Sequence, residues 1–283
     1  MKNTKSNLIA FVLLLTMGSL LFWGCKKDTS LKTANYRAAQ DNSTAENTFN
    51  RSYNQISKAM RQVGSKSVND TIVGCPTLYI TGAWPNKVVT LDFGTACTGD
   101  DGVVRRGKII STATGLYVDS NSTITSTFEN YYETINGVDH HVTGTQVIKN
   151  LGHNAAGHPH FSVDVQNASI SYTEGTINWT SQRQNEWISG YDTYMNPWDD
   201  EYLVSGVSNG TDINGAAFSV QIQNASPLDC KYCQNLYSWI IASGKLDIIN
   251  AGYPNITVDY GNGSCDYIVY VIINGVTYTF VLA

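Results

Sequence analysis

The sequence predicts an all-β domain: an antiparallel meandering sandwich or strongly curved sheet of about 12 strands, with one N-terminal amphipathic helix packed on it. From Thr77 to the C-terminus, apolar and polar residues alternate with period two, which is typical of half-buried strands. Turn dipeptides such as Asn136-Gly137 and Asn274-Gly275 separate these segments, and such short connections join antiparallel neighbours. No helical segments alternate with the strands, which argues against a parallel α/β fold.

The first 24 residues have the pattern of a bacterial export signal. Two lysines precede an apolar run over residues 8–23, which is short for a membrane-spanning helix. Gly24 then stands directly before Cys25, as a small residue does at the cleavage site of a lipoprotein. We therefore expect removal of residues 1–24 and lipidation of Cys25. The alternative is an uncleaved membrane anchor with an incidental cysteine.

Lipidation of Cys25 makes a membrane the first expected partner of the chain. Acyl chains add about 0.8 kcal/mol per buried methylene, and more than one chain makes anchoring stable. No later segment approaches the run of about 18 apolar residues that a membrane-spanning helix needs. The anchor would hold the body outside the cytoplasm, where disulfide bonds form.

The composition argues against a nucleic-acid partner. Without the two lysines of the leader, 16 basic residues (18 − 2) face 23 acidic ones, which gives a formal charge of −7. Nucleic-acid binding needs a clustered basic surface, and the sequence has none. Only 14% of the residues are charged, which fits a β domain with polar outer faces.

The body of the chain begins with a tether and a helix. Residues 25–42 are polar and without periodicity, so they predict a tether. Ser43 and Glu46 form the pattern of a capping box, after which apolar residues recur at spacings of three and four. We therefore expect a helix over residues 43–63 that packs on the sheet, within a single domain over residues 43–283.

Thirteen segments qualify as strands by alternation and by the turn residues that bound them. They are 78–81, 88–93, 103–117, 123–135, 138–149, 161–172, 176–187, 201–208, 216–224, 237–249, 256–260, 267–273 and 277–282.

An internal echo links the two ends of this series. Residues 78–97 and 246–265 both contain a short strand, an aromatic-Pro-Asn turn, a second strand and a final cysteine. The second strand ends in Asp-aromatic-Gly in both copies, at 92–94 and 259–261. Two copies are too few for a solenoid. They predict pseudo-symmetric hairpins at the two ends of the sheet.

Five cysteines remain after Cys25, so at most two disulfides form: Cys75, Cys97, Cys230, Cys233 and Cys265. Folding the first hairpin brings Cys75 near Cys97, and we expect these two to be bridged.

The pairing of Cys265 stays open, because Cys230 and Cys233 both lie within reach on a neighbouring strand. The Cys-x-x-Cys spacing of Cys230 and Cys233 also occurs in redox dithiols, but those require a thioredoxin-like context that the sequence does not predict. A structural bridge from one of the two to Cys265 is therefore the favoured interpretation.

Several motifs form a recognisable set: Asp92-Phe93-Gly94, Cys97-Thr98-Gly99, Asp101-Gly102, Arg105-Arg106-Gly107-Lys108-Ile109, Phe128-Glu129-Asn130-Tyr131, residues 239–244, Asp259-Tyr260-Gly261 and Cys265-Asp266. The chain thereby resembles uncharacterised surface or periplasmic lipoproteins of the Bacteroidetes, over most of the region after the tether. The resemblance implies an all-β body and an anchor in the outer membrane, on its surface or periplasmic face. It implies no activity, and residues 230–233 exceed the usual cysteine set of the group.

The segment over residues 187–202 is the most suggestive surface for a ligand. Its aromatic side chains could hold the C–H face of a sugar or form a protein contact. The alternative is that they cap the end of the sheet. The five residues are Trp187, Tyr191, Tyr194, Trp198 and Tyr202.

A metal site is a weaker hypothesis. Imidazoles bind zinc and copper, and His158 and His160 would share one strand face, where His140 could join them. Asp100 and Asp101 with Asp92 could hold calcium, although their spacing is not that of an EF-hand. An ordinary exposed loop and a solvated acidic turn are the favoured interpretations of these two patterns.

These observations favour a non-enzymatic binding module for a glycan or a surface protein, without a cofactor. A purely structural envelope component is the second interpretation. A hydrolase is the third, because paired carboxylates need only meet in space, although the sequence contains no nucleophile elbow, phosphate-binding loop or zinc-protease motif.

Overall fold

The computed structural model describes residues 36–64, 66, 70–236, 238–250 and 252–281. In this part of the chain one long helix, α2 (Tyr36–Val63), precedes all the strands. The strands are β1 (Asp70–Ile72), β2 (Thr77–Thr81), β3 (Lys87–Asp92), β4 (Cys97–Thr98), β5 (Val104–Ala113), β6 (Thr123–Ile135), β7 (Val138–His153), β8 (Pro159–Tyr172), β9 (Gly175–Ser189), β10 (Glu201–Thr211), β11 (Ala217–Ile222), β12 (Leu228–Cys233), β13 (Ser238–Asn250), β14 (Ile256–Asn262), β15 (Ile268–Ile273) and β16 (Val276–Val281). Two short 3-10 helices, η1 (Tyr191–Thr193) and η2 (Pro197–Asp199), connect β9 to β10.

All the described strands belong to one antiparallel sheet. Its order is β1-β2-β3-β5-β6-β7-β8-β9-β10-β11-β13-β14-β15-β16, while β4 pairs with β5, and β12 pairs with β10 and β13. The prediction of an antiparallel all-β body with one helix is confirmed. The number of about 12 strands was too low, because β1 and β4 are only three and two residues long, and the residues of β12 do not alternate between buried and exposed.

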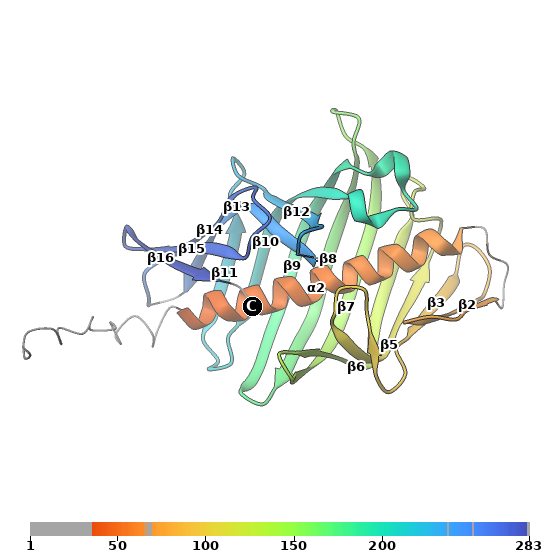
Figure 1. The fold of residues 1–283 in the computed structure, drawn as a ribbon, viewed down its shortest axis with the longest axis horizontal. Helices are drawn as coiled ribbons and strands as arrows, with labels where there is room; N and C mark the ends of the chain where they lie inside the picture. The colour runs from red at the N-terminus through yellow and green to blue at the C-terminus, as the bar shows by residue number, and fades with distance from the viewer. Residues whose placement is uncertain (1–35, 65, 67–69, 237, 251, 282–283) are drawn as a thin grey trace, which may run out of the picture.

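The sheet curves around α2, which lies obliquely across its strands (Figure 1). The helix contacts β3, β9 and β13, which are far apart in the strand order, so it runs across most of the width of the sheet. Phe49 at the middle of the helix stacks on Trp179 of β9, with ring centroids 5.5 Å apart. Of the two architectures that the sequence left open, this is the strongly curved sheet.

The helix begins at Tyr36, seven residues before the predicted start at Ser43. Residues 37–42 are therefore helix and not tether. Asp41 accepts a hydrogen bond from the backbone of Ile213 (2.9 Å), and Asn42 accepts one from the indole of Trp179 (3.1 Å). These tertiary partners explain why polar residues continue the helix, and the Ser43–Glu46 pattern is not a helix start.

Ion pairs attach α2 to the sheet from inside. Glu46 contacts Arg183 of β9 (2.5 Å), and Arg61 contacts Asp200 beside β10 (2.5 Å), with all four side chains at most 4% exposed. Opposite charges offset each other's burial cost when their hydrogen bonds are satisfied. The polar stripe of the helix therefore carries structural contacts of its own.

The internal echo is visible in the fold. Residues 78–97 include the hairpin β2–β3, and residues 246–265 include the hairpin β13–β14, near opposite ends of the strand order. The Asp-aromatic-Gly motifs of the two copies also have the same hydrogen bond. Asp92 accepts it from the backbone of Gly94 (2.8 Å), and Asp259 accepts it from the backbone of Gly261 (2.9 Å). The prediction of two related hairpins is confirmed.

A bulge at Gly107 bends β5 against β6. The pairing register shifts between Arg106 and Lys108, and Gly107 adopts a left-handed φ of +83°. A side chain there would overlap the carbonyl oxygen of Asn130 on β6. Because bulges increase local twist, glycine at this position helps the sheet to close around the helix.

Candidate functional site

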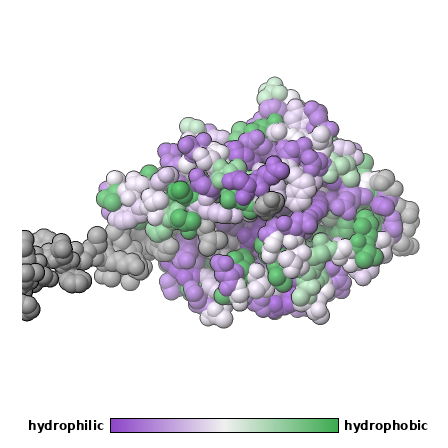
Figure 2. All heavy atoms as spheres, viewed as in Figure 1, coloured by the Kyte–Doolittle hydropathy of each residue, from purple (hydrophilic) through white to green (hydrophobic). Residues whose placement is uncertain are grey.

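A cleft of about 390 Å³ opens over the middle of α2, where two groups of loops approach each other above the helix. The helix supplies a polar floor that includes Asn47, Asn50 and Asn54. One wall contains residues 100–103 and 134–136, and the other contains residues 197–198, 238–241 and 266–269. Hydrophilic residues cover much of the surface on this side of the molecule (Figure 2).

Each wall includes a loop that directly follows one copy of the internal echo. Residues 100–103 follow Cys97, and residues 266–269 follow Cys265. Each of these cysteines is bridged, Cys97 to Cys75 and Cys265 to Cys233. The fold therefore places a disulfide-bonded loop on either side of the helix.

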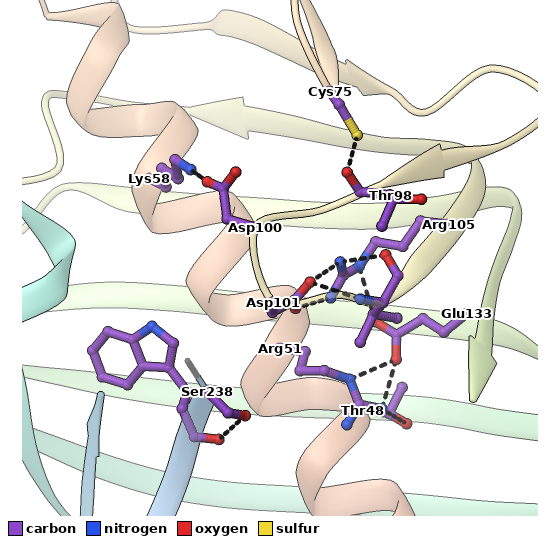
Figure 3. Close-up of polar contacts among 12 residues, drawn as sticks. Thr48, Arg51, Lys58, Cys75, Thr98, Asp100, Asp101, Arg105, Glu133 and Ser238 are labelled. Carbon is purple, nitrogen blue, oxygen red and sulfur yellow. Dashed lines mark hydrogen bonds and ion pairs between the residues drawn. The ribbon is translucent and has the colours of Figure 1, made fainter. Parts of the chain in front are cut away.

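A charged network supports the first wall. Arg105 of β5 donates to both carboxylate oxygens of Asp101 (2.8 and 2.5 Å), and Arg51 of α2 donates to Glu133 of β6 (2.9 and 2.7 Å). The phenol of Tyr131 also donates to Glu133 (2.9 Å). Figure 3 shows Arg51 and Arg105 converging on Glu133 from opposite sides. This network holds the 100–103 loop in position above the helix.

The Asp101 carboxylate of this network is held as an anion. Burial alone would raise the pKa of Asp101, but the hydrogen bonds and charge of Arg105 lower it below its ordinary value of 3.8. Burial likewise opposes the charge of Arg105, and Asp101 with Glu133 nevertheless raises the pKa of this guanidinium. The pair Asp101–Arg105 is therefore ionised at neutral pH.

Lys58 connects the two walls across the helix. Its ammonium pairs with Asp100 of the first wall and lies 5.3 Å from the ring centroid of Trp198 in the second. Figure 3 shows this lysine projecting from the helix toward Asp100. Such cation–π contacts orient an aromatic ring as well as a charge.

Two indoles, Trp198 and Trp239, line the second wall and are connected through the ring of Tyr232. The ring of Trp198 lies 4.7 Å from that of Tyr232 on β12, which lies 6.2 Å from Trp239 on β13. Trp198 is 40% exposed, so its ring is available to a ligand. Tyr232 and Trp239 were missed as site residues by the sequence analysis, because only the pairing of β12 with β13 brings them beside Trp198.

The predicted aromatic segment is divided by the fold. Trp187 and Tyr202 are core residues, 1% and 3% exposed, and their rings stack at 5.7 Å. Tyr191 is half-buried against Trp187, and Tyr194 is 42% exposed. Of the five, Trp198 and the buried Tyr202 line the cleft. The prediction of one exposed aromatic surface was therefore wrong for Trp187 and Tyr202.

The histidines do not form a common site. His158 hydrogen-bonds with Glu186 (2.7 Å), and His160 contacts the carbonyl of Gly152 (3.0 Å), at one end of β7–β8. His140 contacts the carbonyl of Val138 (3.0 Å) at the opposite end of β7. The hypothesis of a site shared by all three histidines was wrong, because antiparallel pairing separates them along the strands. The described residues contain no cluster of three metal ligands.

The carboxylates of Asp92, Asp100 and Asp101 already have partners within the protein. Asp100 contacts Lys58, Asp101 contacts Arg105, and Asp92 accepts the backbone hydrogen bond of Gly94. The calcium hypothesis for these three residues is therefore not supported by their geometry.

The cysteine pairing resolves the alternatives left by the sequence. The expected bridge between Cys75 and Cys97 is present, and Cys265 pairs with Cys233. Cys230 is the free cysteine of the described residues and lines the cleft, and burial raises the pKa of its thiol. The Cys-x-x-Cys pattern is thus divided between a structural bridge and a thiol whose raised pKa disfavours the reactive thiolate.

Cys25, residues 1–24 and most of the predicted tether lie outside the described residues. No helix in the described ranges is both long and apolar enough to span a membrane.

No protein-family model, curated protein or solved structure matches the chain. The resemblance to Bacteroidetes lipoproteins therefore stays a prediction.

Proposed function

We propose that this chain is a non-enzymatic, lipid-anchored binding protein of the bacterial cell envelope, and that the cleft above α2 holds a glycan. The observation that carries the proposal is that two indoles, Trp198 and Trp239, line the same cleft as the asparagines of the helix, with the ring of Tyr232 in contact with both indoles. Ligand sites typically combine apolar rings with a few polar groups that fix orientation.

The chemistry of the cleft suits a sugar ring. An exposed indole such as that of Trp198 can cover the C–H face of a pyranose. The amides of Asn47, Asn50 and Asn54 can donate to hydroxyl groups and accept from them. Both kinds of group face the same volume, so one ligand can use them together.

The charge balance favours a neutral glycan over a polyanion. The two basic side chains that line the cleft, Arg51 and Lys58, are each paired with a carboxylate in the described structure. A phosphate or sulfate group would have to compete with those carboxylates for a cation. A neutral sugar can bind without displacing these carboxylates from their cations.

The same pairing supports binding over hydrolysis. A glycosidase needs one carboxylic acid that stays protonated and can donate its proton to the leaving oxygen. Asp101 at the cleft has a lowered pKa and two hydrogen bonds from Arg105, which favours the anion. It is therefore poorly suited to act as that acid. Burial raises the pKa of Asp200, which also lines the cleft, to about 6, but Arg61 and the indole of Trp187 donate hydrogen bonds to its two carboxylate oxygens, so both oxygens are already occupied.

The proposal includes an anchor at Cys25, eleven residues before the helix begins. Mass spectrometry of the protein from its native host should find no residues 1–24 and acyl chains on Cys25. An intact N-terminal methionine, or an unmodified thiol at Cys25, would contradict the anchor. Neither result would bear on glycan binding, which is tested separately.

The glycan proposal is tested by an array screen followed by calorimetry with the best-binding glycan. Trp198→Ala should weaken binding at least about tenfold, which corresponds to ~1.4 kcal/mol. Trp84→Ala is the matched control, because Trp84 is 38% exposed and also lies beside a lysine, but does not line the cleft. Equal losses in both variants, or no glycan binding by the unaltered protein, would contradict the proposal and favour a structural role in the envelope.

A further inference from the structure

The inner end of the cleft contains an amide without a partner. Asn185 on β9 is 5% exposed and lines the cleft. Its Oδ1 is buried, and neither atom of its amide has a hydrogen-bond partner among the described residues. A buried acceptor that is left unpaired costs stability, so its presence in a cavity points to a donor that arrives with a ligand.

The walls around Asn185 are otherwise apolar or already satisfied. Val204 is buried, and Ile241 and Trp239 line the same cleft. The hydroxyl of Tyr53 pairs with that of Tyr117 (2.8 Å), so the phenol presents its ring to the cleft and not a free polar group. The inner end therefore offers the unpaired amide of Asn185, with its buried acceptor oxygen, beside apolar side chains and the thiol of Cys230.

We infer that this inner end accepts the acetamido group of an N-acetylhexosamine, an inference that rests on the proposed glycan function. In a trans acetamide the N–H and the methyl group lie on the same side of the C–N bond, and the carbonyl oxygen lies on the other side. A single wall can therefore receive the N–H at Asn185 Oδ1 and the methyl against Val204 and Ile241. The carbonyl oxygen then points away from this wall, toward the open part of the cleft.

Other common sugar substituents fit this end less well. A hydroxyl can donate to Asn185, but it leaves the apolar walls without a partner. A carboxylate cannot donate to Oδ1, and an ammonium would be buried there without an opposing charge. A peptide also has an N–H, but its chain continues on both sides of each amide. The inner end is lined by buried residues such as Tyr53 and Tyr260, which suits a group that terminates there.

The inference predicts that the protein distinguishes two sugars that differ only in the substituent at C2, an acetamido group in one and a hydroxyl group in the other. Calorimetry of the purified full-length protein in detergent compares the β-1,4-linked trimer of N-acetylglucosamine with the β-1,4-linked trimer of glucose. The unaltered protein should bind the acetylated trimer at least about tenfold more tightly. This comparison needs no variant, so it does not depend on the folding of any substitution.

Asn185→Leu then tests the residue. Leucine has a similar size and removes the unpaired acceptor without breaking a hydrogen bond, so the melting temperature should not fall. The variant should lose most of the tenfold preference and retain the affinity for the glucose trimer. Asn178→Leu is the matched control, since Asn178 lies on the exposed face of the same strand and should leave the preference intact.

The outcomes separate this inference from the proposed function. Equal affinity for both trimers overturns the inference and leaves glycan binding standing. So does a glycan ligand that has no acetamido group, or a preference that Asn185→Leu does not change. If no glycan binds at all, the proposed function fails and this inference fails with it.

Discussion

Arg183 of β9 donates two hydrogen bonds to Glu46 of α2, at 3.1 and 2.5 Å, inside the closed interior between helix and sheet. A third hydrogen bond joins the same guanidinium to Ser208 of β10 (3.2 Å). One ion pair thus connects the first described element of the chain to two strands that lie more than 130 positions later, since 183 − 46 = 137. This pair gives the first prediction.

Glu46→Gln should lower the free energy of unfolding by about 3–5 kcal/mol, because it leaves the charge of Arg183 buried without an anion. Chemical denaturation measures the change. Asp139→Asn is the control, since the pair Arg106–Asp139 is 35% and 47% exposed and should contribute at most about 1 kcal/mol. Similar small losses in both variants would mean that the buried pair does not hold the helix in place.

Gly107→Ala should destabilise the sheet by more than about 3 kcal/mol, because φ at this position is +83° and the new methyl would overlap the carbonyl of Asn130. Gly137→Ala is the control. Gly137 has a similar φ of +76° but open space around it, so it should cost about 1 kcal/mol. Thermal unfolding distinguishes the two, and equal losses would contradict the role of the bulge.

Cys233→Ser and Cys265→Ser should each cost about 3–4 kcal/mol, as expected for a bridge that closes a loop of this length. The double variant should cost little more than either single variant, because both remove the same bond. Cys230→Ala should cost about 1 kcal/mol, since it removes only a half-buried, unbridged thiol. The reverse pattern, a large loss at Cys230 and a small one at Cys233, would assign the bridge to Cys230.

The pair Asp101–Arg105 should make the first wall of the cleft sensitive to acid. The folded protein lowers the pKa of Asp101, so the stability it contributes is present above the ordinary value of 3.8 and is lost as the pH falls through the lower folded value. The difference in unfolding free energy between the unaltered protein and Asp101→Asn should be about 2 kcal/mol and constant above about pH 5. It should shrink as the pH falls below 3.8. A difference that grows on acidification would refute this pair as the cause.

Much of the fold could be read from the sequence because strands, turns and the helix stripe are local signals. Asn136-Gly137 and Asn274-Gly275 join β6 to β7 and β15 to β16, as their turn propensities predict. The start of the helix could not be read, because Asp41 and Asn42 are stabilised by Ile213 and Trp179, whose positions depend on the folded sheet.

The cleft was harder to foresee than the fold. Trp198 was predicted as a binding residue from local composition, and it does line the cleft. Its neighbours Tyr232 and Trp239 come from strands whose pairing no periodicity specifies. Asn185 lies on the same strand face as Trp179 and Trp187, so the alternation of β9 itself turns it inward. The sequence analysis missed it because a polar residue at a buried strand position is unusual.

The order of elements along the chain has a consequence for biogenesis. The helix is the first described element, yet every strand that packs around it comes later in the sequence. A chain that is still being synthesised or exported therefore holds Glu46 before Arg183 exists to neutralise it, and Phe49 before Trp179 exists to cover it. Stable tertiary structure must wait for the distal strands, so a precursor exported as we propose would still be unfolded when it reaches the translocation machinery.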